Sequence, residues 1–233
     1  MKNIVIGIEG PVGSGKTSIC RELVKEIPNT VFLNGGNLYR AIVYAMVKNG
    51  KKLDSVKNID IKEMMDLFKV QIKVKNNETF MYIDNELISE ESLQSKESSM
   101  AVSTIGGKAN NENLFIFARN LIDDLKNKSN VVISGRSIMQ IYPDTDYHFF
   151  ITADLEERVK RKCIQYENTE THDEIMRNII KRDKLQEDAG FYTLSENTFE
   201  VDVTKCKSVE ESTSLVMEII RKHGIYKQEI ARI

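Results

Sequence analysis

The spacing of apolar residues predicts strands and helices that alternate along most of the chain. Residues 3–8 are almost continuously apolar and branched, which is typical of a strand covered on both faces. Residues 18–27 instead carry apolar side chains at helical spacing, and Pro28 ends that helix. Further strands are predicted at 30–33, 131–134, 148–152 and 198–203, and further helices at 37–49, 114–125, 155–167, 174–188 and 209–223. This alternation favours an α/β fold, with a mostly parallel sheet and helices on both faces.

One region departs from the alternation. Residues 68–74 and 79–83 alternate apolar and polar side chains on either side of Asn76-Asn77, which predicts a β-hairpin. We therefore expect residues 53–100 to form an insert, and residues 1–52 and 101–233 to form the core. Within the core, residues 155–188 hold two charged helices around a polar interruption and are predicted to form a lid.

Composition narrows the class of protein. A chain of 233 residues that is 41% hydrophobic and 29% charged is typical of one globular domain with a modest insertion. Its net charge of −2 provides no overall attraction to a nucleic-acid polymer or to an anionic membrane. No apolar run approaches a membrane span, and the N-terminus lacks a signal-peptide pattern, so we expect a cytoplasmic protein.

The cysteines and histidines of this chain do not indicate a disulfide framework or a metal site. Cys20, Cys163 and Cys206 are odd in number and widely spaced, so we expect free thiols that pack in the interior. The histidines have no ligand-like spacing to one another or to cysteine, which argues against a metal site. Phe191 and Tyr192 are expected to pack, with contact to a nucleobase as the alternative.

The clearest candidate site follows the first strand. Gly10-Pro11-Val12-Gly13-Ser14-Gly15-Lys16-Thr17 matches the pattern GxxxxGK[ST] at every fixed position, between a predicted strand and a predicted helix. Glycines let the backbone bend so that its N–H groups face phosphate oxygens, and the helix start adds a positive dipole. We expect Gly10 to Ser18 to bind ATP, with Lys16 on the β- and γ-phosphates and the Thr17 hydroxyl on Mg²⁺.

Cationic side chains recur in the predicted lid. Arg158, Arg161 and Lys162 lie three and four residues apart and therefore share a helix face. The second lid helix repeats the pattern with Arg177, Lys181, Arg182 and Lys184. Such cations would stabilise the charge that spreads over a phosphoryl group during transfer. A solvated basic face tempered by nearby glutamates is the alternative.

Several segments resemble the bacterial cytidylate (CMP/dCMP) kinases, over nearly the whole chain. Ile8-Glu9-Gly10-Pro11 is similar to that family's I-D-G-P, and residues 33–40, LNGGNLYR, are similar to its L-D-T-G-x-x-Y-R. Residues 134–137, SGRS, resemble D-G-R-D, and residues 156–158, EER, resemble the lid motif E-E-R. The resemblance implies a three-layer P-loop kinase fold with a small β-containing monophosphate-binding insert and a helical lid.

The resemblance also implies an activity and a set of residues. It implies a monomeric phosphotransferase that uses ATP and Mg²⁺ to convert CMP or dCMP to the diphosphate, with a nucleotide and no polymer or membrane as its partner. Its catalytic residues would be Lys16, Arg136, Arg158 and Arg161, and Arg158 would also contact ATP. Its acceptor-binding residues would be Asn34, Gly36, Tyr39, Arg40, Ser103, Arg136, Ser137, Arg182 and Gln186.

The departures from the family pattern gather at the acceptor site. Ser134, Ser137 and Gln186 stand where the family has aspartate, and Ala189 stands where it has arginine. A carboxylate near the central strand helps to place Mg²⁺ through its water shell, so we expect Glu9 or Asp183 to take part of that role. The changes leave open two alternatives: a kinase for another nucleotide or a small-molecule hydroxyl, and a protein that binds nucleotide without useful turnover.

Overall fold

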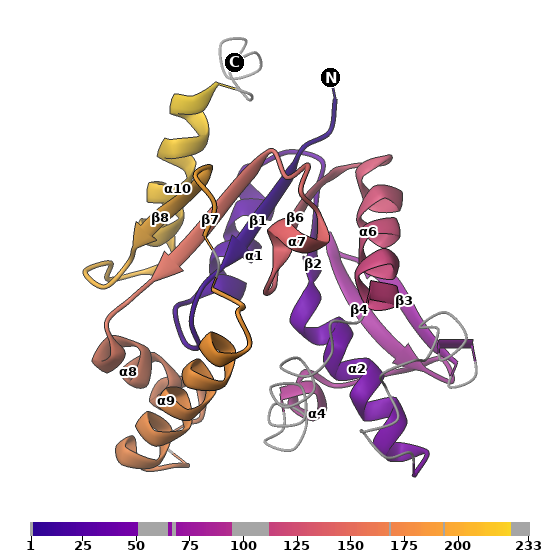
Figure 1. The fold of residues 1–233 in the computed structure, drawn as a ribbon, viewed down its shortest axis with the longest axis horizontal. Helices are drawn as coiled ribbons and strands as arrows, with labels where there is room; N and C mark the ends of the chain where they lie inside the picture. The colour runs from indigo at the N-terminus through magenta and orange to yellow at the C-terminus, as the bar shows by residue number, and fades with distance from the viewer. Residues whose placement is uncertain are drawn as a thin grey trace.

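A parallel sheet organises the chain, and its central strand is the one that leads into the glycine-rich loop. The computed structural model describes residues 2–50, 65–66, 69–94, 112–167, 169–192 and 194–224. Strand β1 (Val5–Glu9) is wholly buried between β6 (Asn130–Ser134) and β7 (Tyr147–Thr152), both parallel to it. β2 (Thr30–Asn34) lies beyond β6, and β8 (Thr198–Asp202) beyond β7 (Figure 1). The predicted α/β class is confirmed.

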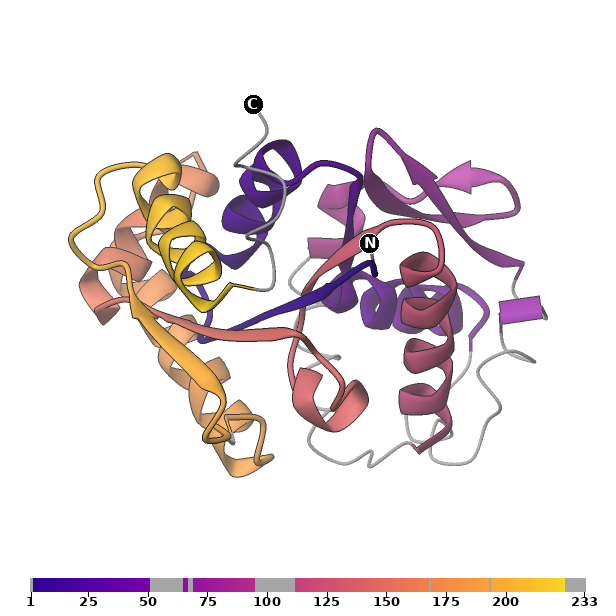
Figure 2. The same cartoon turned by 90° about the horizontal axis from the view of Figure 1, so that it is seen from above.

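Helices cover both faces of this sheet. Alternate β1 residues, such as Ile6 and Ile8, pack against α1 (Lys16–Glu26) and α10 (Val209–His223). Val5 faces the other side, where α6 (Glu112–Lys126) and the short α7 (Ile138–Ile141) complete a second core. Figure 2 shows α1 and α10 on one side of β1 and β7, with α7 on the other. This two-sided cover explains why the strand sequences are continuously apolar.

The predicted hairpin is confirmed, and it extends the main sheet. β3 (Val70–Lys75) and β4 (Glu78–Ile83) pair antiparallel, and Asn76 and Asn77 join them with φ angles of 51° and 60°. β4 also pairs parallel to β2 at Phe32, and β5 (Glu86–Leu87) pairs with β4. Of the predicted insert 53–100, the structure describes residues 65–66 and 69–94; helix α4 (Glu90–Gln94) belongs to this part.

Two packed helices form the predicted lid segment at the carboxyl ends of the strands. α8 (Leu155–Gln165) and α9 (His172–Asp188) pack on each other, and α9 begins two residues earlier than predicted because Thr171 and Glu174 form a capping box. Val159 and Ile175 bury Val12 of the glycine-rich loop, so the lid is docked on that loop. Helix α2 (Gly35–Lys48) lies opposite, after β2 (Figure 1). No helix in the described part of the chain is long and apolar enough to cross a membrane.

Candidate active site

The loop between β1 and α1 needs glycine at three positions. Gly10, Gly13 and Gly15 have φ angles of 142°, 82° and 93°, a region that L side chains rarely adopt. A Cβ at Gly10 would lie 2.1 Å from the carbonyl oxygen of Ile151, and one at Gly13 would lie 3.0 Å from that of Arg158. The predicted phosphate-binding loop is therefore built as its sequence requires, with no room for larger residues at its first two glycines.

A cavity of about 790 Å³ opens at this loop, between the carboxyl ends of the strands and the lid. The site residues predicted from sequence that line it are Val12, Gly13, Gly15, Lys16, Thr17, Ser18, Asn34, Gly36, Tyr39, Arg40, Arg136, Ser137, Arg161, Arg182 and Gln186. Gly10, Pro11, Ser14 and Arg158 are not part of its lining, and Ser103 lies outside the described residues. One cavity thus gathers residues from both predicted sub-sites, as expected where ligands bind in open α/β sheets.

The wall of this cavity is strongly cationic. It carries nine basic side chains: Lys16, Arg21, Arg40, Arg136, Lys160, Arg161, Lys162, Arg182 and Lys207. Its acidic side chains are Glu90 and Glu157 alone among the described lining residues. An isolated cluster of this kind is costly because like charges repel in a low-dielectric setting. The imbalance favours a ligand that carries several negative charges.

Burial and mutual repulsion act on the cations themselves. Burial first, and then the charges of Arg136 and Lys162, lowers the pKa of Lys16 to about 7. Burial and nearby arginines also lower the pKa of Lys162 to about 8, and those of Arg40 and Arg136 to about 10. The Nε atoms of Arg40 and Arg182 are buried and have no hydrogen-bond partner within the described part of the chain. These buried cations, with donors left unpaired, therefore favour the binding of an anion.

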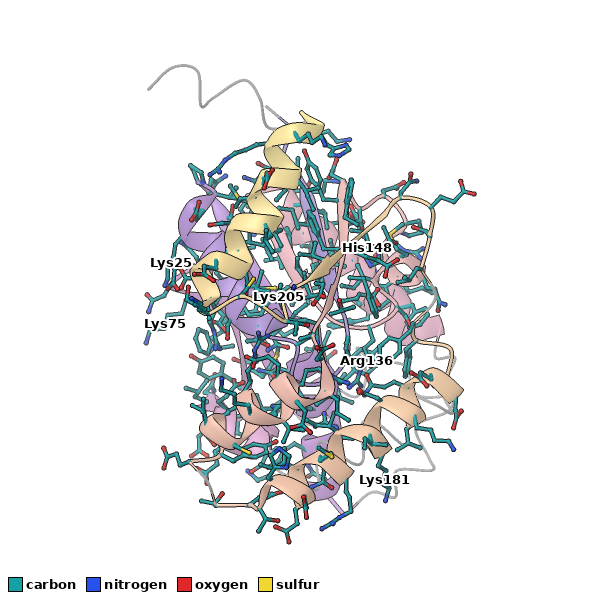
Figure 3. The ribbon with its side chains drawn as sticks, turned by 90° about the vertical axis from the view of Figure 1, so that its left-hand side faces the viewer. Lys25, Lys75, Arg136, His148, Lys181 and Lys205 are labelled. Carbon is teal, nitrogen blue, oxygen red and sulfur yellow. The ribbon has the colours of Figure 1, made fainter. Side chains whose placement is uncertain are left out.

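Three arginines from three separate elements reach the cavity wall. Arg40 comes from α2, Arg136 follows β6, and Arg182 comes from α9. Arg136 lies over the ring of Phe191, 6.0 Å from its centroid. In Figure 3, Arg136 lies between the sheet and the lid helices, whereas Lys181 is on the outer face of α9.

The second lid helix contributes fewer cations to the cavity wall than its sequence suggests. Of its predicted basic residues, Arg182 lines the cavity, while Arg177, Lys181 and Lys184 are exposed. The solvated-face alternative therefore holds for these three.

Lys16 and Arg158 both bind the loop backbone. The Lys16 Nζ donates to the Pro11 carbonyl at 2.6 Å and contacts the Ser14 Oγ at 3.4 Å. Arg158 donates to the Val12 carbonyl at 3.1 Å and pairs with Asp183, which in turn accepts from the Val12 N–H at 3.1 Å. Arg158 and Asp183 thus fasten the lid to the loop.

Asn34 and Arg161 have structural partners of their own. The Asn34 side-chain oxygen accepts from the Asn37 N–H at 3.1 Å, which caps the start of α2. Arg161 donates to the Val203 carbonyl at 2.9 Å and to Glu157 at 3.0 Å, and so fastens α8 to the end of the sheet. Both residues nevertheless contribute to the cavity wall.

A buried network around Glu9 escaped the sequence analysis. The Glu9 carboxylate accepts the backbone N–H groups of Ser137 at 3.2 Å and Ile138 at 2.5 Å, and its Oε1 lies 3.2 Å from His148 Nε2. His148 Nδ1 is in turn 2.8 Å from the Thr198 hydroxyl. Gly7 was the one nearby residue in the sequence that could have indicated this network. It pairs with His148, and its missing side chain leaves room for the imidazole.

A magnesium ion fits this site if one side-chain hydroxyl, phosphate oxygens and waters are its ligands. The Thr17 side chain lies on the cavity wall at the start of α1. Glu9 and Asp183 are both engaged elsewhere, and the described residues include no group of three or more side chains typical of a protein-built metal site. The arrangement suits Mg²⁺, which keeps several waters and binds mainly to phosphate oxygens and one hydroxyl.

Comparison with known proteins decides the family. The family model described as cytidylate kinase matches residues 6–222. The chain belongs to the cytidylate kinase family. It is therefore a phosphotransferase of the kinase type, and the family resemblance stated from its motifs is confirmed.

Cytidylate kinase relatives agree with this placement. The cytidylate kinase of Clostridioides difficile is 33% identical over 230 residues, covering 95% of this chain and 99% of its own length. That of Aquifex aeolicus is 29% identical, covering 94% and 96%. Among solved structures, shikimate kinase from Bacteroides thetaiotaomicron has a TM-score of 0.46 at 15% identity, covering 94% of this chain and 98% of its own.

Proposed function

We propose that this protein transfers the γ-phosphoryl group of ATP to the phosphate of CMP or dCMP, and that it uses Mg²⁺. One observation carries the proposal: the glycine-rich loop and three arginines from three elements face a single cavity whose charged side chains, among the described lining residues, are nine cations and two carboxylates. Two phosphorylated substrates would bring the negative charge that this wall lacks. Membership of the cytidylate kinase family supports the choice of acceptor.

On the donor side, the loop would bind the phosphates of ATP. Its glycines allow the close approach of the backbone, and the start of α1 adds a positive end. The Lys16 ammonium would leave the Pro11 carbonyl for the phosphates. The Thr17 hydroxyl would hold Mg²⁺, which supplies charge neutralisation at the phosphate oxygens when bound.

On the acceptor side, Arg40, Arg136 and Arg182 would grip the monophosphate. A guanidinium group can donate two parallel hydrogen bonds to phosphate oxygens, and this fixes direction as well as position. A phosphate oxygen of the acceptor would then attack the γ-phosphorus, while the bond to the β–γ bridging oxygen breaks and ADP departs. The side chains act by position and charge, with no covalent intermediate.

A panel of acceptors tests this proposal. ADP release with Mg-ATP should be fastest with CMP and dCMP, slower with UMP, and close to background with AMP or with no acceptor. A Lys16→Ala control should show no acceptor-dependent ADP release at normal folding. The proposal fails if the wild-type protein releases ADP only with a different class of acceptor, or if turnover is independent of any acceptor.

A further inference from the structure

His148 is a buried histidine with a polar partner at each ring nitrogen. It lies on β7, its exposed fraction is 2%, and it is not part of the cavity wall. Its Nε2 is 3.2 Å from Glu9 Oε1, and its Nδ1 is 2.8 Å from the Thr198 hydroxyl. That hydroxyl oxygen also accepts the Ser195 N–H at 3.1 Å. The ring is therefore fixed between the central strand β1 and the edge strand β8.

Glu9 joins this histidine to the start of α7. The exposed fraction of Glu9 is 4%, and its two carboxylate oxygens accept one backbone N–H each. Oε1 accepts from Ile138 at 2.5 Å, and Oε2 accepts from Ser137 at 3.2 Å. Oε1 thus meets both Ile138 and His148, whichever atom of the Glu9–His148 contact carries the proton. The imidazole therefore holds the carboxylate in the orientation that both backbone donors need.

Ser137 is the residue that depends on this support. Its φ and ψ angles are 54° and 32°, a left-handed conformation that favours glycine over serine. A strained residue of this kind persists only where its surroundings fix it, and here Glu9 binds its N–H. Arg136 immediately precedes Ser137, so a change in the Ser137 backbone would redirect the Arg136 side chain.

The polar contacts of His148, rather than its size, are what this position needs. Gly7 pairs with His148, and a Cβ at Gly7 would lie 3.3 Å from His148 Cδ2 and 2.8 Å from Ile138 Cγ2. Glycine on β1 thus lets the ring and the start of α7 approach the central strand closely. An apolar side chain could fill the same space as the ring, but it would leave Glu9 without its third partner.

We propose that His148 is a positioning residue for the acceptor site: through Glu9 it keeps Ser137 in the left-handed conformation and thereby sets the direction of Arg136. The inference rests on the proposed function, which assigns Arg136 to the acceptor phosphate. Figure 3 shows His148 within the sheet and Arg136 closer to the lid helices. Because His148 does not line the cavity, it acts on the reaction through Glu9 alone.

Two amides at position 148 separate the two contacts of the ring. The amide of His148→Gln can reach Glu9, as Nε2 does, whereas that of His148→Asn reaches only as far as Nδ1 and Thr198. The KM for CMP should rise about fivefold in His148→Asn and stay within about twofold in His148→Gln, with the KM for ATP unchanged in both. Tyr147→Phe is the matched control, because Tyr147 is buried on the same strand and donates to the Ile220 carbonyl at 3.3 Å. It should lower the thermal midpoint and leave the KM for CMP unchanged.

Ser137→Gly tests the route from His148 to Arg136. Glycine adopts the left-handed conformation without support, so in this background His148→Asn should change the KM for CMP by less than about twofold. Thermal midpoints give the same comparison without activity: Ser137→Gly should reduce the loss of midpoint that His148→Asn causes, even if that variant is too unstable for kinetics.

The inference is overturned if His148→Asn and His148→Gln have the same KM for CMP, or if the KM values for CMP and ATP rise together. It is also overturned if glycine at position 137 lessens neither the KM effect nor the loss of midpoint. Wild-type turnover with CMP tests the proposed function separately, since the comparison of midpoints tests the support of Ser137 whatever the acceptor is.

Discussion

Glu9 and His148 form a buried pair, with 3.2 Å between Oε1 and Nε2, and the Glu9 carboxylate binds the backbone of two residues of the cavity wall, Ser137 and Ile138. Glu9 ends β1, one residue before the phosphate-binding loop, and its carboxylate also takes the first N–H groups of the segment that leads into α7. Ser137 in that segment has a φ of 54°, which an unsupported serine rarely adopts. The pair therefore fixes the position of Arg136, which immediately precedes Ser137.

A Glu9→Gln variant should lose stability and acceptor binding together. The amide has one accepting oxygen for two backbone donors, so we expect the free energy of unfolding to fall by about 1–3 kcal/mol. The KM for CMP should rise several-fold because the backbone that carries Arg136 loosens. Half-saturation by Mg²⁺ should not change, since the carboxylate faces Ser137 and Ile138.

The control for this variant is Glu26→Gln, an exposed carboxylate whose removal should be nearly neutral. Urea unfolding and steady-state kinetics measure the three quantities. A variant with full stability but a weakened Mg²⁺ response would restore the role in metal placement expected from the sequence.

The sequence predicts the structural features that depend on residues close to one another along the chain. The bend of the glycine-rich loop, the buried strand before it and the Asn76-Asn77 turn are each coded within a few consecutive residues, and the structure shows all three. The early start of α9 was also readable, because Thr171 and Glu174 have capping-box spacing. Local chemistry thus accounts for most of the fold.

Contacts between distant segments could not be predicted in the same way. The sequence places His148 in a predicted strand but not beside Glu9, because Glu9 lies 139 positions away and meets it only once β1 and β7 pair. The pairing of β4 with β2 cannot be predicted from the sequence either, since nothing near Phe32 specifies Glu78 as its neighbour. The roles of Asn34 and Arg158 in capping and fastening likewise depend on the folded backbone.

Asp183→Asn should release the lid from the phosphate-binding loop. The side chains of Asp183 and Arg158 are 14% and 11% exposed, and Asp183 also binds the Val12 N–H. Removing the charge leaves the largely buried Arg158 without its carboxylate partner, a change that costs about 3–5 kcal/mol where such a pair is buried. We expect kcat to fall about tenfold and the KM for ATP to rise.

Asp188→Asn is the matched control, because Asp188 ends the same helix and is exposed. Steady-state kinetics with both variants, together with urea unfolding, separates the ion pair from a general effect of charge on α9. Equal behaviour of the two variants would contradict a fastening role for Asp183.

Lys16→Met should stabilise the nucleotide-free protein while it abolishes turnover. Burial lowers the pKa of Lys16 from 10.5 to about 7, so the folded state binds fewer protons than the unfolded state between those values. The cost of holding the ammonium is therefore fully present below pH 7 and declines as the pH rises toward 10.5. The variant should gain a few degrees in thermal midpoint at pH 6, and little at pH 10.

Differential scanning fluorimetry across this pH range, alongside the kinase assay, measures both effects. Lys25→Met serves as control, since Lys25 is an exposed surface lysine near the end of α1. A lower midpoint for Lys16→Met at pH 6 would show that the ammonium supports the loop in the free protein.

ATP binding should take up a proton and weaken as the pH rises above 7. The groups that act on the pKa of Lys16 are Arg136, Lys162 and Arg182, which lower it, and Asp183, which raises it. Phosphates in the loop favour the ammonium form, so the pKa of Lys16 rises on binding. Between about 7 and that higher value, affinity should fall by up to about tenfold per pH unit.

Calorimetric titration with ATP at pH 8, in two buffers of different ionisation enthalpy, measures the proton uptake. The wild-type protein should take up close to one proton, and Lys16→Met close to none. Lys162, whose pKa is lowered to about 8, is the other group that could contribute, so a Lys162→Met variant separates the two. If the uptake persists in Lys16→Met and disappears in Lys162→Met, Lys162 is the group that takes up the proton. Lys16 is then already charged before the nucleotide binds.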